Sequence, residues 1–145
     1  FATHVDEVDD RAFCLRALAD RYAEVGDDAH LENANDRLGR LGCNQPEECV
    51  ENLMHAATLE RSRKRLVRAI SFVKKAAERA PERDDLYETW AMWAEESGAW
   101  GEAATLWSKL GARRPEGPFL QRAADARAHV AAPVVLPTSA RSASP

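Results

Sequence analysis

Apolar residues recur every three or four positions over seven stretches of this chain, and glycine, proline or acidic residues separate most of these stretches. Side chains at that spacing fall on one face of an α-helix, because an α-helix turns once every 3.6 residues. Proline and carboxylates favour helix starts, and glycine and proline favour helix ends. The pattern predicts seven helices, at about residues 11–25, 29–41, 46–60, 62–79, 84–97, 100–110 and 118–130.

Two glycines and one proline mark expected helix ends. Gly42 is expected to stop the second helix in a left-handed conformation, and Gly111 and Pro115 are expected to close the sixth. The boundary between the third and fourth helices, at 60–64, carries no strong breaking signal.

The helical domain is expected to cover residues 11–131. Residues 1–10 show no helical period and are predicted to be a lead-in. Residues 132–145 combine three prolines with small residues, and this favours an extended tail because proline removes a backbone donor. Its apolar start, Val134–Leu136, is expected to lie in a groove of this chain or of a second copy, which would allow self-assembly through the tail.

An interval of 34 residues relates the middle pair of helices to the last pair. A helical hairpin that cannot bury its own apolar face stacks on the next hairpin, so such a period predicts a repeat array. Small residues at shared positions let helices approach closely where they cross. The coinciding positions are Leu53 with Tyr87, Ala56 with Trp90, Ala57 with Ala91, Ala69 with Ala103, Val73 with Trp107, Ala76 with Leu110, and Pro81 with Pro115.

These residues resemble the tetratricopeptide repeat (TPR), a 34-residue helical hairpin. The resemblance is closest over 84–115, where Gly98 stands at the turn, and weaker over 48–81, where Lys64 replaces that glycine. It is loosest over 11–41, where Leu31 and Asn35 replace the usual alanine and aromatic. It implies an all-α fold, a short right-handed superhelix of about three hairpins with a C-terminal capping helix. The alternative is a plain antiparallel helical bundle with coincidental spacing.

The resemblance also implies a binding surface, because the family usually holds a peptide or helix in the groove lined by the first helix of each hairpin. Family members that clamp a C-terminal carboxylate need lysine and asparagine there, so that role is not expected. The acidic last hairpin would favour a basic segment, and the alternative is a solvated helix face. The corresponding residues are Phe13, Arg16, Asp20, Glu24, Glu51, Met54, Thr58, Arg61, Asp85, Glu88, Met92, Glu95 and Glu96.

The expected function is therefore non-catalytic: a scaffold or adaptor that binds a protein or peptide partner or assembles into a larger complex. The four histidines are scattered, and no HExxH, glycine-rich phosphate loop or nucleophile elbow is present, so no cofactor or metal is expected. A docking or dimerisation domain of a larger enzyme or regulator is an alternative. The chain starts at Phe1, so it is expected to be a processed chain or a fragment.

A basic block at residues 61–75 offers a second alternative, the binding of nucleic acid or another anionic surface. Only Phe72 is interleaved with its cations, which is poor for stacking on bases. The favoured interpretation is a solvent-exposed helix face whose cations pair with acidic residues on the first two helices. The net charge of −4 also argues against a dedicated nucleic-acid binder. No run of about 18 apolar residues exists, so no membrane span is expected.

Three cysteines cannot form a complete disulfide framework. Cys43 and Cys49 flank a short loop, so their α-carbons can lie within disulfide range. A disulfide there would indicate a bacterial periplasm or secretion and leave Cys14 free and buried. Three reduced thiols, as in a cytoplasmic protein, are the equal alternative.

All four tryptophans fall within residues 84–115 and invite interpretation as a ligand cage. The repeat phase instead places Trp90 and Trp107 in the core. Trp93 and Trp100 are less determined and are expected to be partly exposed.

Overall fold

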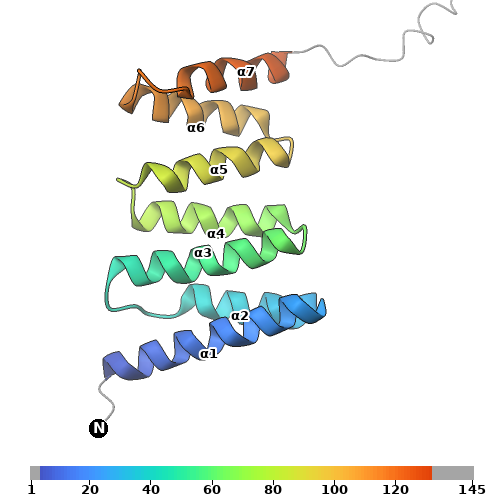
Figure 1. Ribbon diagram of the computed structural model, residues 1–145, viewed down its shortest axis with the longest axis vertical. Helices are drawn as coiled ribbons and strands as arrows, with labels where there is room; N and C mark the ends of the chain where they lie inside the picture. The colour runs from blue at the N-terminus through green and yellow to red at the C-terminus, as the bar shows by residue number, and fades with distance from the viewer. Residues whose placement is uncertain (1–3, 132–145) are drawn as a thin grey trace, which may run out of the picture.

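The computed structural model describes residues 4–131, with side chains from residue 11 to residue 130. Within that part the chain forms seven α-helices and no strand, which confirms the all-α prediction. Figure 1 shows the helices stacked along the longest axis of the molecule, from α1 at one end to α7 at the other. They are α1 (His4–Val25), α2 (Asp28–Arg40), α3 (Pro46–Ser62), α4 (Leu66–Arg79), α5 (Asp84–Glu96), α6 (Trp100–Arg113) and α7 (Phe119–Ala131).

Local chemistry explains several helix starts. The side chain of Asp27 caps α2 by accepting a hydrogen bond from the backbone N–H of His30, at 3.2 Å. Pro46 opens α3 without needing a backbone partner, and the carboxylate of Glu48 accepts a bond from the backbone N–H of Asn44, at 3.0 Å. Helix α5 begins with two aspartates, whose charge suits the positive end of the helix dipole.

Several helix boundaries differ from the sequence prediction. Helix α3 continues through Ser62 and α4 begins at Leu66, whereas the fourth helix was expected from residue 62. Helix α1 begins at His4, so residues 4–10 continue the helix instead of forming a lead-in. Gly42 does not stop α2 in a left-handed conformation, because Leu41 ends the helix with extended backbone angles. Helix α6 runs through Gly111 to Arg113. The tail at 132–145, and the prediction that Val134–Leu136 fills a groove, lie outside the described residues.

The turn inside each hairpin has one residue with left-handed backbone. These residues are Gly26, Lys64 and Gly98, with φ of 74°, 61° and 83°. Lys64 therefore occupies the position where the repeat expects a glycine. The helix ends here, between α3 and α4, although the sequence carries no strong helix-breaking signal at this point. The Cβ of Lys64 makes this conformation costly for a non-glycine residue.

Burial follows the 34-residue interval closely. Ala57 and Ala91 are both fully buried, and the same holds for Ala69 with Ala103, Val73 with Trp107, and Ala76 with Leu110. These side chains belong to one continuous apolar core that extends from α3 to α7. The first hairpin, α1 with α2, has only two small apolar clusters of its own.

A close approach joins α6 to α7 at Gly111. A Cβ on this residue would lie 2.7 Å from Cγ of Leu120 and 3.2 Å from its backbone nitrogen. Only glycine leaves room for α7 at this distance, so Gly111 acts as a packing residue inside α6 and not as a helix stop.

The burial of the tryptophans differs in part from the sequence prediction. Trp107 is fully buried as expected, whereas Trp90 is only half-buried and donates a hydrogen bond from Nε1 to Glu102, at 3.0 Å. Trp93 is buried at 7% exposure instead of partly exposed. Trp100 is half-buried and stacks on His129.

Cys43 and Cys49 form a disulfide with α-carbons 5.6 Å apart, which settles the open choice between a bridge and free thiols. Cys14 is free, but it is exposed and not buried as expected.

Candidate protein-binding face

Side-chain contacts join the first helices of the three hairpins. From α1 to α3, Nη1 of Arg16 donates to Oδ1 of Asn52 at 2.5 Å, and Nε2 of His55 lies 2.7 Å from Oδ1 of Asp20. From α3 to α5, Arg61 donates two bonds to Oε2 of Glu96, at 2.9 and 3.1 Å. We call the surface that carries the predicted binding residues of α1, α3 and α5 the first-helix face.

Several predicted residues of the first-helix face are accessible. Phe13 is 67% exposed and Met92 is 43% exposed, both large values for apolar side chains. Glu24, Glu51 and Thr58 are exposed as well, and Met54 and Glu88 are half-buried. The hydroxyl of Thr58 donates to the backbone carbonyl of Met54, at 2.8 Å. Aromatic residues and methionine are enriched at protein–protein interfaces, so Phe13 and Met92 suit a protein-binding surface.

The acidic end of the face carries less free charge than its sequence indicates. Asp85 accepts bonds from Nη2 and Nε of Arg83 at 2.7 and 3.2 Å, and the hydrogen bond from Arg83 lowers the pKa of the Asp85 carboxyl against the opposing effect of burial. Glu95 accepts a bond from Nε1 of Trp107 and pairs with Arg122 at 3.5 Å. The carboxylate of Glu95 is therefore engaged by α6 and α7.

Arg61 sits between a carboxylate and an aromatic ring. Its guanidinium pairs with Glu96 and lies 5.4 Å from the ring centroid of Trp93, in cation–π geometry. Both charged side chains of this pair are 45% exposed. An arriving segment can therefore reach either group.

Two residues on this face were not singled out from the sequence. Asn52 and His55 hold α3 against α1, through Arg16 and Asp20. Partners in these contacts are 36 and 35 residues apart, close to one repeat length. Comparing polar residues one repeat apart on neighbouring first helices would have found both pairs.

The basic block is largely neutralised by ion pairs. Arg63 donates to Asp28 at 2.8 Å, and this hydrogen bond is the main reason that the pKa of the Asp28 carboxyl is lowered. The other pairs within 4 Å are Arg65 with Glu32 and Glu60, Arg68 with Glu32, Asp36 and Glu60, and Arg61 with Glu96. Most of these pairs join α4 or its leading turn to carboxylates of α2, as expected. Arg65 and Arg68 are only about a quarter exposed, however, so they do not form the solvent-exposed helix face that was expected.

Glu60 lies at the centre of that network and is fully buried. Its Oε2 accepts bonds from Nδ2 of Asn35 and Nε of Arg68, both at 3.1 Å, and Arg65 lies 3.5 Å from its Oε1. Asn35 is also fully buried, and it stands where the repeat expects an aromatic residue. A polar network thus replaces the apolar contact that Val73 and Trp107 make in the later hairpins.

Two other kinds of feature are absent from the described residues. No group of three or more histidine, cysteine, aspartate or glutamate side chains there has the arrangement of a metal site. None of the helices in that part is both long enough and apolar enough to cross a membrane.

Comparison with known proteins adds no family assignment. A scan of protein-family models finds no match to this chain, and a search of curated proteins finds no relative.

Proposed function

We propose that this chain is a TPR-like helical-repeat module that binds a protein or peptide partner through the first-helix face. In this proposal, three hairpins form a short right-handed superhelix and α7 acts as the capping helix. The matched burial of positions 34 residues apart and the left-handed turn residue in each hairpin support a repeat architecture. The role is that of a scaffold or adaptor without catalysis.

The observation that carries the proposal is the joining of α1, α3 and α5 by side chains that remain partly accessible. Arg16, Asp20 and Arg61 each bond to the neighbouring first helix. These contacts hold the three helices in register, so that exposed Phe13 and Met92 are presented on a supported surface. Methionine adapts its shape to different apolar partners, which suits a peptide-binding surface.

The chemistry of the face favours a partner segment with apolar side chains and a basic group. Glu88 and Met92 are one helical turn apart on α5, so their side chains project from the same face of that helix. Glu88 takes part in no ion pair among the described side chains, in contrast to Asp85 and Glu96. A lysine or arginine of the partner is therefore expected to lie near Glu88.

Site-specific photocrosslinking tests this proposal. A benzophenone amino acid at Met92 should capture the native partner, whereas the same group at Val67 should not, although Val67 is 81% exposed on α4. Glu88→Lys should reduce capture at position 92. Equal capture from positions 67 and 92, or unchanged capture with Glu88→Lys, would contradict binding at this face.

Binding of an anionic partner through residues 61–75 has less support, because four arginines of this block already pair with carboxylates. A steep loss of affinity between low and moderate salt, with RNA or DNA retained by the protein on a filter, would favour it over the first-helix face.

The disulfide bears on where the protein works. Disulfides persist in oxidising compartments and are rare where cellular thiols are kept reduced. We therefore place the proposed function in a periplasm or outside the cell, on the basis of the Cys43–Cys49 bridge.

A further inference from the structure

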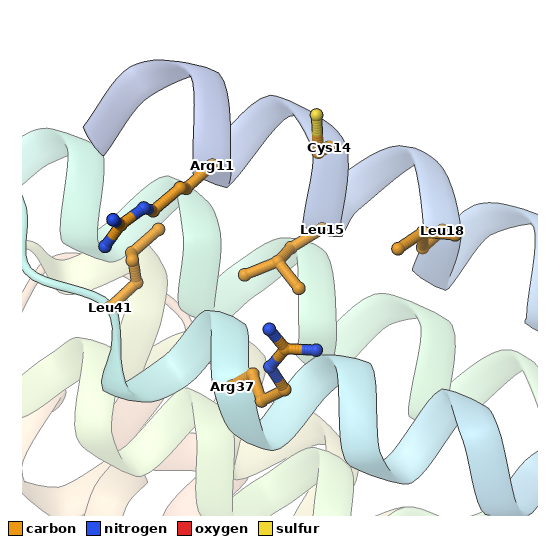
Figure 2. A pocket seen from close by; sticks show the side chains of 6 residues that line it. All are labelled: Arg11, Cys14, Leu15, Leu18, Arg37 and Leu41. Atoms are coloured by element: carbon orange, nitrogen blue, oxygen red, sulfur yellow. The ribbon is translucent and has the colours of Figure 1, made fainter. Parts of the chain in front are cut away.

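A second surface lies between α1 and α2, at the end of the array formed by the first hairpin. Figure 2 shows a hollow here, with side chains of both helices around it. Its volume is about 330 Å³. The lining residues are Arg11, Cys14, Leu15, Leu18, Arg37 and Leu41. We call this surface the outer groove.

The position of the outer groove suits a helical partner. Helix α3 packs against both α1 and α2, so this hairpin already holds one helix in a groove between its own two helices. The outer groove lies between the same two helices. Leu18 is 45% exposed, and Val25, two turns further along α1, is 57% exposed. These values leave an apolar stripe on α1 that another helix can cover.

The described side chains that line the outer groove carry positive charge. Its lining contains the guanidinium groups of Arg11 and Arg37 and no carboxylate among the described side chains. Figure 2 shows Arg11 extending from α1 toward Leu41, and Arg37 pointing from α2 toward α1. The arginines of the basic block, by contrast, are matched by carboxylates of α2, α3 and α5.

We propose that the outer groove binds an acidic amphipathic helix of a partner protein. Leucine-like side chains of that helix would fill the space around Leu15, Leu18 and Leu41, and flanking carboxylates would meet Arg11 and Arg37. This surface is separate from the first-helix face, so the protein would hold two partners, or two segments of one partner, at once.

Protection of Cys14 tests the proposal directly. Cys14 lines the groove and is exposed, and the other two cysteines are joined in a disulfide, so unreduced protein offers one thiol to iodoacetamide. The probe is a 14-residue helical peptide with leucines along one face and glutamates beside them. Its matched control carries lysines in place of the glutamates. At ten times its Kd, the acidic peptide should slow alkylation of Cys14 about tenfold, whereas the lysine peptide should not.

Variants separate the groove from general charge effects. Arg37→Glu should weaken binding of the acidic peptide roughly tenfold, and Arg11→Glu should act in the same direction. Arg79→Glu makes the same charge change at an exposed position of α4, and it should leave binding of the acidic peptide unchanged. Circular dichroism of each variant checks that the helices persist, and photocrosslinking at Met92 should be unaffected by Arg37→Glu.

Three results would overturn the proposal. The first is equal protection of Cys14 by both peptides, or by neither. The second is full protection in both the Arg37→Glu and Arg11→Glu variants. The third is protection of Cys14 without any peptide in a protein whose solution mass is that of a dimer, which would make a second copy the occupant.

Discussion

At the scale of single residues, the main departure from expectation is the buried carboxylate of Glu60. Glutamate is among the side chains least often found fully buried unless it is paired. Here Asn35, Arg65 and Arg68 surround it, and the two arginines also reach carboxylates on α2. The residue therefore links α2, α3 and α4 at one point.

Replacing Glu60 by glutamine should destabilise the protein. Glutamine keeps the shape, but its amide group brings a donor toward arginine groups that can only donate. Because Arg65 and Arg68 are about a quarter exposed and keep other carboxylates, the expected loss is about 1–3 kcal/mol. Urea unfolding followed by circular dichroism measures it. Glu78→Gln, on the exposed side of α4, is the control, and equal midpoints for the two variants would refute the role given to Glu60.

Lys64 provides a second test at this scale. Its φ of 61° places a Cβ in the left-handed region, which is costly for any residue except glycine. Lys64→Gly should therefore raise the free energy of unfolding by about 0.5–1 kcal/mol. Gly98→Ala should lower it by about 1 kcal/mol, because a Cβ there meets no neighbouring atom and only backbone strain is added. A loss of stability in Lys64→Gly would show that the lysine side chain itself matters.

At the scale of helices, the first hairpin differs from the others in the kind of contact that joins it to its neighbour. The later helices share one apolar core, whereas α1 and α2 join α3 and α4 largely through charged and polar pairs. Apolar contacts supplement these pairs. Leu59 of α3 packs against the cluster of Ala19, Leu31 and Ala34, and the ring of Phe72 would lie 3.0 Å from a Cβ at Gly39, so this glycine makes room for it. The junction between the first two hairpins is therefore the part of the array most exposed to salt screening.

The contact of α6 with α7 yields a matched pair of glycine substitutions. Gly111→Ala places a methyl group against Leu120 and its backbone nitrogen, so α7 must shift, at a cost of about 1–2 kcal/mol. Gly101→Ala lies in the same helix with nothing within 4 Å of the new Cβ, so it should be neutral or slightly stabilising. Thermal unfolding compares the two. A cost at position 101 as large as at position 111 would point to helix α6 itself and not to its packing.

At the scale of the whole molecule, the disulfide fixes the loop between the first and second hairpins. Cys43 and Cys49 are six positions apart, and closing a loop of about seven residues corresponds to roughly 2 kcal/mol of stabilisation. Reduction, or the double substitution of both cysteines by serine, should lower the free energy of unfolding by that amount. Cys14→Ser should not change it. If reduction leaves the unfolding midpoint in place, the bridge does not stabilise the array.

The sequence predicted much of the fold but little of the surface chemistry. Helix positions followed from apolar spacing and from signals such as Pro46, and the fully buried Trp107 followed from the 34-residue phase. The break at Lys64 was poorly marked, because a lysine carries no signal for left-handed backbone. The exposed Cys14 was placed wrongly, because helical spacing does not reveal which side of a terminal helix lacks a neighbour.

By itself, the sequence determined that this chain is helical and where most helices begin and end, because these properties depend on residues within a few turns of each other. It also determined which positions repeat, because that is a comparison of residue types 34 positions apart. Only the tertiary structure decided that Asp20 meets His55, that Glu60 is buried among arginines, and that an arginine-lined groove stays open between α1 and α2. Those features join different helices, and the bonds of Asp20 with His55 and of Asn35 with Glu60 join residues 35 and 25 positions apart in the chain. They depend on how one hairpin is set against the next, which no local pattern of apolar residues specifies.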